Sequence, residues 1–328
     1  MRALPASSFL AAALSAALVT LTGCPGAKIP GQGGSKVDPN TCGNYATTDT
    51  GRKLKAFLSA TVRLDQESQR IVNIVGESCA IMGRELQMAA GELEGQPKDV
   101  CDRVLARLND DLKVAFKGSA SLKVDYKPAV CKVDASVAAR AAAQCEAKAE
   151  ADVKVTCEGT CSGACDGTCK GSTGSGGQCN GVCQGSCQGS CDGTADVEAS
   201  AQCKAEAEVN ASVDVQCTEP ELTVEAEASA IVDAAKAEHA IAAIKNGLPR
   251  ILSVQARLRP LQAAAKTWAR TAGELASEGR ELAQSFQDQA LCISGQIAAV
   301  GEAVGRINAN ISVSVEVSVS ASASAGVK

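Results

Sequence analysis

The sequence is poor in aromatic residues and contains a single histidine. Aromatic side chains make up 2% of the 328 residues, and His239 is the only imidazole. So few large rings predict that the chain builds no large, dense core. His239 lies in an alanine-rich helical segment with no second histidine and no paired nucleophile, so the sequence offers no acid–base or nucleophilic site. We therefore predict a protein that is not an enzyme and needs no cofactor.

Long apolar runs and an excess of basic charge are also missing. The apolar run at residues 9–21 follows Arg2, and it is too short and wrongly flanked for a spanning helix but typical of a secretory signal. The whole chain has a formal net charge of −5. The segment 131–217 holds 6 basic and 12 acidic residues. This balance argues against a nucleic-acid partner and against contact between this segment and an anionic membrane surface.

The end of the signal carries a short motif. Residues 21–24 are Leu-Thr-Gly-Cys, which resembles the lipobox of bacterial lipoproteins. The resemblance covers only the first 24 residues. It implies a signal peptide at 1–23, a lipid on Cys24, and a place in the bacterial cell envelope, at the outer membrane or cell surface rather than the inner membrane. Residues 24–48 are rich in Gly, Pro, Ser, Thr and Asn, and we expect a flexible lipid-anchored linker there.

Cysteine is abundant, with 17 residues. Without Cys24 the count is even, which suits an oxidising compartment. Twelve cysteines lie in mirror image about Gly174, so that the numbers in each of six pairs add to 348. A constant sum is the register rule of an antiparallel hairpin, and it predicts disulfides between directly opposed residues. The six pairs are Cys131 with Cys217, Cys145 with Cys203, Cys157 with Cys191, Cys161 with Cys187, Cys165 with Cys183, and Cys169 with Cys179.

The two arms of this mirror alternate strictly. Odd positions in 131–157 and 195–217 are mostly Ala, Val or Cys, and the charged residues lie at even positions. Such a period of two predicts strands. Helix is the alternative, because Ala, Glu and Lys favour helices, but alternating charges would leave a helix no apolar stripe. We therefore predict one very long β-hairpin over 118–228.

The tip of the predicted hairpin, residues 157–193, has only Cys and Gly along most of one face. Disulfides must replace a core there, each contributing on the order of 2 to 3 kcal/mol. From Cys131 to Cys169 an extended arm would reach ~125 Å, at ~3.3 Å per residue.

Apolar residues spaced by threes and fours predict helices at 49–117 and 229–310, packed as a coiled-coil bundle. We expect residues 94–97 to break the first helix and Asn246-Gly247 to end another. The last stretch, 311–328, alternates again and predicts a third strand beside the hairpin. The predicted fold is therefore α+β.

Four cysteines remain: Cys42, Cys79, Cys101 and Cys292. If two helices meet in a turn near Gly95, Cys79 and Cys101 lie ~15 Å apart along the axis, too far for a bridge. The sequence therefore favours Cys79 with Cys292 and Cys42 with Cys101.

Two further chemistries need consideration. The CxxxC repeats could form a metal–thiolate cluster, but metal sites need no mirror symmetry and secretion favours oxidation, so we expect no metal. Four carboxylates should face one another across the arms and could attract Ca²⁺, but we favour a solvated acidic face. They are Glu150, Asp152, Asp196 and Glu198.

We predict a non-catalytic, lipid-anchored envelope protein whose stapled hairpin is a spacer, adhesive arm or assembly strut. One alternative is an oligomerising, membrane-active protein that resembles pore-forming toxins in outline only. A second is a secreted thiol- or metal-binding protein. The membrane is the expected partner through Cys24, and the sequence names no protein partner.

Overall fold

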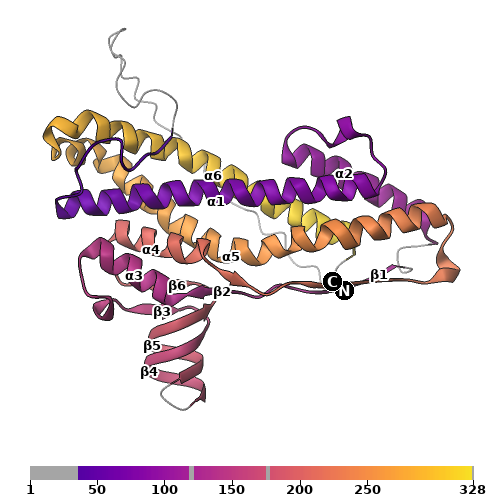
Figure 1. The fold of residues 1–328 in the computed structure, drawn as a ribbon, viewed down its shortest axis with the longest axis horizontal. Helices are drawn as coiled ribbons and strands as arrows, with labels where there is room; N and C mark the ends of the chain where they lie inside the picture. Colours follow the sequence, from indigo (N-terminus) through magenta and orange to yellow (C-terminus); the bar gives the residue numbers. More distant parts are fainter. Residues whose placement is uncertain (1–35, 118–121, 175–177, 327–328) are drawn as a thin grey trace, which may run out of the picture.

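The computed structural model describes residues 36–117, 122–174 and 178–326. Cys24 and the signal segment lie outside these residues. The fold is α+β, with long helices packed together and an antiparallel hairpin laddered by four disulfides. Figure 1 shows α1 and α6 on one side of the molecule, α4 and α5 in the middle, and the hairpin β4–β5 projecting from the other side.

Four long helices form the body: α1 (Asp49–Glu85), α2 (Pro97–Ala115), α5 (Ala234–Gln284) and α6 (Ala290–Ser324). α1 packs against the other three. At the centre, Phe57 stacks on the fully buried Trp268 with ring centroids 6.2 Å apart. The Trp268 indole donates a 2.8 Å hydrogen bond to Thr61, so the polar group of this buried ring is satisfied.

Local signals set the helix starts. The Thr48 hydroxyl accepts from the backbone N–H of Gly51 before α1, and the Asp233 carboxylate accepts from that of Lys236 before α5. These are N-caps, which satisfy donors that have no partner within the helix. α2 begins at Pro97, whose missing N–H costs nothing at this position.

The predicted helix end at Asn246-Gly247 is wrong, because α5 continues through it. Gly247 is instead a packing position. A Cβ there would lie 2.1 Å from Cγ of Met82 and 2.9 Å from the carbonyl oxygen of Ser78 on α1. The glycine therefore permits close approach of two helices and does not end one.

The predicted C-terminal strand is also wrong, because residues 311–324 belong to α6. The alternation conceals a helical stripe of buried residues at Ile307, Ile311, Ser314, Ser318 and Ala321. The two buried serine hydroxyls donate to the carbonyl four residues earlier, at 2.8 Å and 2.7 Å. Serine can therefore occupy the core-facing side of this helix without an unpaired polar group.

The linker is shorter than predicted. Residues 36–48 pack on the body, and Cys42 and Tyr45 are buried. The Tyr45 ring meets Phe286 edge-on at 5.9 Å, and its hydroxyl donates to the carbonyl of Pro39 at 2.8 Å. Any tether must therefore end before residue 36.

The two predicted bridges between helices are both wrong. Cys42 joins Cys292, and Cys79 joins Cys101. The error lies in the position of the turn, because α1 ends at Glu85 and Gln87 adopts a left-handed φ of 57°. With α2 beginning at residue 97, Cys79 and Cys101 lie a similar distance from the ends of their helices, so they can bridge.

Two short ladders support the hairpin. β1 (Leu122–Lys127) pairs with β8 (Glu221–Ala226), and β2 (Cys131–Asp134) pairs with β7 (Gln216–Cys217). Both keep the predicted sum of 348, with Val124 opposite Val224 and Cys131 opposite Cys217. The mirror therefore gives the register correctly at the start of both arms.

Beyond these ladders the prediction of continuous strands fails. The alanine-rich parts form α3 (Ala135–Glu146) and α4 (Ala201–Val213), followed on one arm by a 3-10 turn at Glu150–Asp152. Only β3 (Val155–Cys157) and β6 (Ala195–Val197) are extended between helices and tip. The arm from Cys131 to Cys169 contains α3 and the 3-10 turn, so it cannot reach the predicted ~125 Å, which assumed ~3.3 Å for every residue.

α4 explains how a period of two fits a helix. Ala205 and Val209 face the main bundle core, whereas Ala207 and Ala211 face a second core with α3 and the hairpin. Successive odd positions differ by ~200° around a helix, so they fall alternately on two opposite faces. The charged even positions occupy the two edges between those faces. The alternation therefore describes a helix buried on both sides.

Candidate functional site

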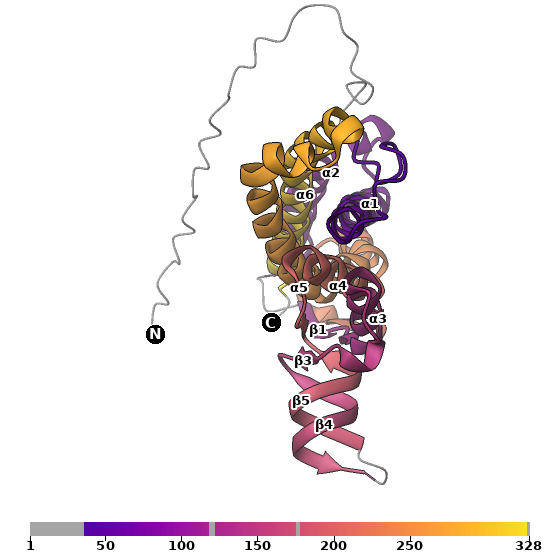
Figure 2. The ribbon, with the colours of Figure 1, turned by 90° about the vertical axis from the view of Figure 1, so that its left-hand side faces the viewer.

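The most distinctive part of the surface is the hairpin of β4 (Thr160–Thr173) and β5 (Gln178–Asp192). Figure 2 shows the two strands winding around each other as a coiled ribbon that projects from the body. Its sequence places Cys or Gly at every odd position but two, because position 173 is Thr and position 175 is Ser. Because side chains alternate along a strand, these residues face inward and the even positions face outward.

All six mirror pairs are disulfides in the structure. In the tip, however, bonded cysteines are not opposite neighbours. The ladder places Cys165 opposite Cys187, a sum of 352, yet Cys165 bonds to Cys183. Cys169 likewise lies opposite Cys183 and bonds to Cys179. The predicted connectivity is therefore right and the predicted direct opposition is wrong, since the bridges cross the inside of a coil.

The coil closes on itself. Residues 161–164 pair with 188–191 on one side and with 178–181 on the other. The first part of β4 thus lies between the two ends of β5. This second pairing occupies backbone groups that a flat hairpin would leave at a free edge.

Glycine makes this closure possible, as Gly163 and Gly189 illustrate. They face each other in the ladder with φ of 156° and 149°. A Cβ on Gly163 would lie 2.3 Å from the carbonyl oxygen of Gln188 and 2.9 Å from Cα of Gly189. Only glycine lets the two backbones approach so closely.

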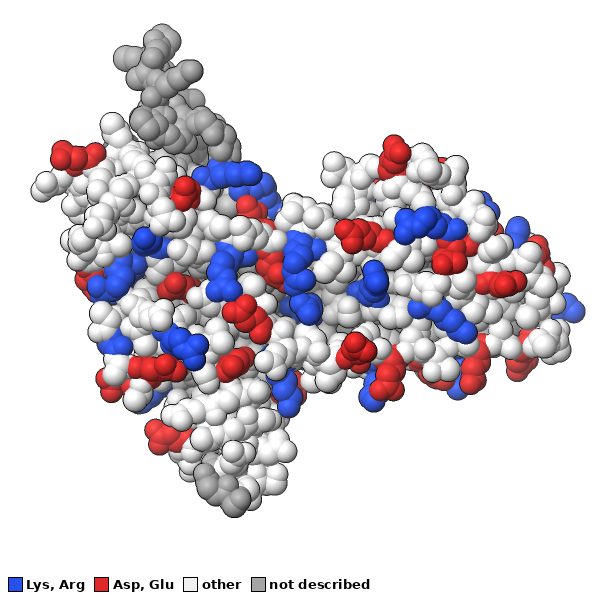
Figure 3. Space-filling view, in the orientation of Figure 1, with Lys and Arg blue, Asp and Glu red and all other residues white. Residues whose placement is uncertain are grey.

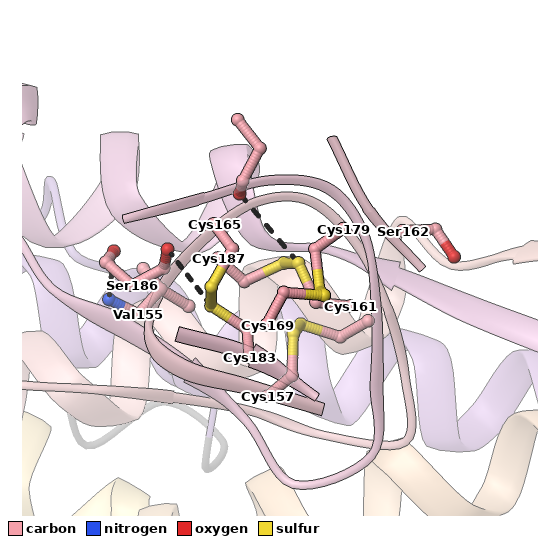
Figure 4. Close-up of a disulfide and its surroundings, with 12 residues drawn as sticks. Val155, Cys157, Cys161, Ser162, Cys165, Cys169, Cys179, Cys183, Ser186 and Cys187 are labelled. Carbon is pink, nitrogen blue, oxygen red and sulfur yellow. Dashed lines mark hydrogen bonds between the residues drawn. A yellow bond between two sulfur atoms is a disulfide. The ribbon is translucent and has the colours of Figure 1, made fainter. Parts of the chain in front are cut away.

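Sulfur fills the interior. Cys161, Cys187 and Cys191 are almost fully buried, and Figure 4 shows the bridges within the loops of the ribbon. The Sγ atoms of Cys157, Cys161 and Cys187 lie within 4.8 Å of one another. Among the described residues this is the only group of ligating atoms close enough for one ion, but each sulfur belongs to a disulfide. A disulfide sulfur is not a thiolate, so this oxidised cluster does not offer the ligands that soft metals require.

The outside of the hairpin is polar with little charge. Figure 3 shows acidic and basic side chains spread over the body, whereas the projecting hairpin is nearly free of them on the face shown. Its strands contain three charged residues, Asp166, Lys170 and Asp192. The other outward positions are mostly Ser, Thr, Asn and Gln. The acidic excess expected on the hairpin therefore lies mainly at its base.

The base joins the hairpin firmly to the body. β5 pairs with β2 as well as β4, which places Val133 opposite Cys191. The N–H of Val155 donates to the Ser186 hydroxyl at 3.1 Å. Cys145 on α3 also bonds to Cys203 on α4, so the two helices beneath the hairpin are cross-linked. These connections fix the direction of the projecting ribbon.

Three glutamates in the base have perturbed ionisation. Burial raises the pKa of Glu206 to about 7, despite the nearby Arg63 charge. Burial also raises the pKa of Glu208, and this effect outweighs a hydrogen bond from Thr267 that lowers it. For Glu146, burial would raise the pKa, but the hydrogen bond from the Ser200 backbone N–H and an ion pair with Lys53 outweigh it and lower the pKa.

The four carboxylates proposed for Ca²⁺ do not gather into a site. Glu150 lies 3.9 Å from Arg140, and Asp196 forms an ion pair with Lys204.

His239 is half-buried near the start of α5. What the sequence reasoning missed is the burial of Glu206 and Glu208, because it placed their alternating positions on the open face of a strand.

The disulfide content indicates the compartment. Eight bridges join sixteen cysteines among the described residues, which is typical of extracellular or secreted proteins. One helical stretch in the described part, Gln287–Ser324, is long and apolar enough to cross a membrane. Length and composition alone are weak support for insertion.

Comparison with known proteins adds no assignment. No protein-family model matches this chain, and no curated protein or solved structure matches it either.

Proposed function

We propose that this chain is a non-catalytic, lipid-anchored protein of the bacterial cell envelope whose hairpin is a rigid contact arm. The observation that carries the proposal is the projecting β4–β5 coil, which four disulfides staple and a second strand pairing closes. A structure stabilised by covalent bonds needs no apolar core, so its whole outer surface is available for contact. A long spacer finds no support, since the coil is short.

The position of the N-terminal segment supports anchoring close to the membrane. Cys42 bonds to Cys292 beside the turn between α5 and α6, and Val37 packs against the core of the bundle. Only eleven residues separate Cys24 from Lys36. Fully extended, they span about 40 Å, so a lipid on Cys24 would hold the body near the bilayer.

The polar surface suggests the kind of contact. Outward hydroxyl and amide side chains can donate and accept hydrogen bonds without the cost of removing charges from water. Because the ribbon is covalently fixed, binding would lose little conformational entropy. These properties suit an adhesive arm or an assembly strut.

Bilayer-coated beads would test the arm. Beads carrying the oxidised, lipidated chain should attach to cells of the source bacterium. Replacing residues 157–192, which removes both partners of all four tip bridges, by a short Gly-Ser turn should abolish attachment while leaving the helical circular dichroism unchanged. The matched control is Glu274→Gln, an exposed change on α5 away from the hairpin. Equal attachment with and without the hairpin would refute the contact role.

The anchor needs a separate test. Labelled palmitate should enter the wild-type chain in cells and fail to enter Cys24→Ala, which should move to the soluble fraction. Label in the variant would contradict the lipobox interpretation.

A membrane-active protein is the second candidate, favoured only by the composition of Gln287–Ser324. It predicts dye leakage from sealed liposomes on addition of the oxidised chain. Intact liposomes would remove this candidate.

A further inference from the structure

A cavity of about 460 Å³ lies where the hairpin base meets the body. Its lining comes mainly from the β3–β4 connection, β6, α4 and α5, with Val133 of β2. Six of the lining residues are charged: Glu158, Asp196, Lys204, Glu208, Arg259 and Lys266. This volume is within the range of small-molecule sites in proteins.

Some of these charges are already satisfied. Lys204 forms an ion pair with Asp196 and lies 3.8 Å from Glu208. Burial raises the pKa of Glu208, and Thr267 hydrogen-bonds to its side chain. Lys204 is therefore already paired with carboxylates of the lining, and the three groups together hold one positive charge and up to two negative charges.

The remaining three have no ion-pair partner among the described residues. Glu158 comes from the hairpin side, where its N–H donates to the carbonyl of Thr194 at 3.0 Å. Arg259 and Lys266 come from α5, seven residues apart, and therefore lie about two helical turns apart on similar sides of the helix. The cavity thus has an unpaired anion on one element and two unpaired cations on another.

We propose that this cavity binds a small zwitterion, of the kind formed by the free ends of a short peptide. Its carboxylate would contact Arg259 and Lys266, and its ammonium group would contact Glu158. An arginine fork suits a carboxylate because it can donate two parallel hydrogen bonds. A ligand with a carboxylate but no ammonium group would be repelled by the Glu158 carboxylate. A ligand with only a positive charge would be repelled by Arg259 and Lys266.

The proposal goes beyond the contact arm, which needs no small ligand. A bound zwitterion would link the β3–β4 connection to α5. Ligand occupancy would therefore stabilise the junction between hairpin and body.

Isothermal titration of the oxidised full chain with glycylglycine tests the proposal. We expect saturable binding with one site per chain. N-acetylglycylglycine, which lacks the ammonium group, should bind at least tenfold more weakly. Glu158→Gln and Arg259→Gln should each weaken glycylglycine binding at least tenfold. Both side chains are exposed, so unchanged circular dichroism is expected for both variants.

The matched control is Arg250→Gln, an exposed arginine on the same helix that does not line the cavity. Its affinity should equal that of the unmodified chain. Three results would overturn the proposal: no saturable binding of glycylglycine, equal binding of the acetylated peptide, or equal weakening by all three substitutions.

Discussion

Adding one methyl group to Gly163 tests the coiled path of the β4–β5 ribbon. In Gly163→Ala the new Cβ would lie 2.3 Å from the carbonyl oxygen of Gln188, where ordinary contact begins at 3.4 Å. The facing strand must retreat by about 1 Å, and alanine must hold a φ of 156°. Overpacking and backbone strain together predict a loss of about 2–4 kcal/mol in the local stability of the hairpin.

Hydrogen exchange followed by mass spectrometry measures this loss directly. Each 1.4 kcal/mol is a tenfold change, so amides of β4 and β5 should exchange roughly 30- to 1,000-fold faster. The bundle helices should keep their protection, because the hairpin has its own disulfide-filled interior. The matched control is Gly174→Ala, whose Cβ would meet its nearest neighbour at an ordinary 3.5 Å. Wild-type exchange rates in Gly163→Ala would show that the strands do not approach as closely as the structure indicates.

Three further predictions concern the body and the base. Gly247→Ala should lower the free energy of unfolding, measured by urea titration, by about 1–3 kcal/mol, because its Cβ would meet Met82 and Ser78. Gly273→Ala is the control in the same helix, where a Cβ would enter open space. It should raise the free energy of unfolding by up to ~1 kcal/mol. Glu206 has a folded pKa near 7, above its unfolded value, so the stability of the protein should fall as pH rises from about 4.5 to 7. The fall should be at most ~1.4 kcal/mol per pH unit. Glu206→Gln should reduce this pH dependence of stability in thermal melts. Glu146 has a lowered folded pKa, so its contribution is present above the unfolded value and lost on acidification; Glu146→Gln should destabilise the protein at pH 7 but little at pH 3.

The cysteine connectivity of the arms was predictable because it depends only on symmetry. A chain that folds back at one point brings equidistant residues together, whatever local structure lies between them. The bridge between Cys145 and Cys203 therefore forms although both residues lie on helices where strands were predicted. The four-residue offset within the tip was not predictable, since it arises from coiling in three dimensions.

α4 was missed because the alternation was compared only with a helix that has one buried face. With two buried faces, the same alternation satisfies a helix and also agrees with the preference of alanine for helices. α3 needs no second face, since Ala135, Ala138, Ala142 and Cys145 are buried at ordinary helical spacing. Cys79 and Cys101 were mispaired for a smaller reason. The distance estimate placed the turn near Gly95, whereas α1 ends ten residues earlier and no cap residue in the sequence marks that end.

The alanines on the two broad faces of α4 have a consequence for the direction in which the hairpin points. Helices in contact through alanine approach more closely than those separated by larger side chains. Ala205, Ala207 and Ala211 are fully or almost fully buried. Their small side chains therefore determine how closely α4 approaches the bundle on one side and the hairpin base on the other. Larger residues at these positions would tilt the projecting coil and leave its own bonds and surface intact. The alanine methyl groups of α4 therefore contribute to the direction of the arm, together with the strand pairing and the disulfide at its base.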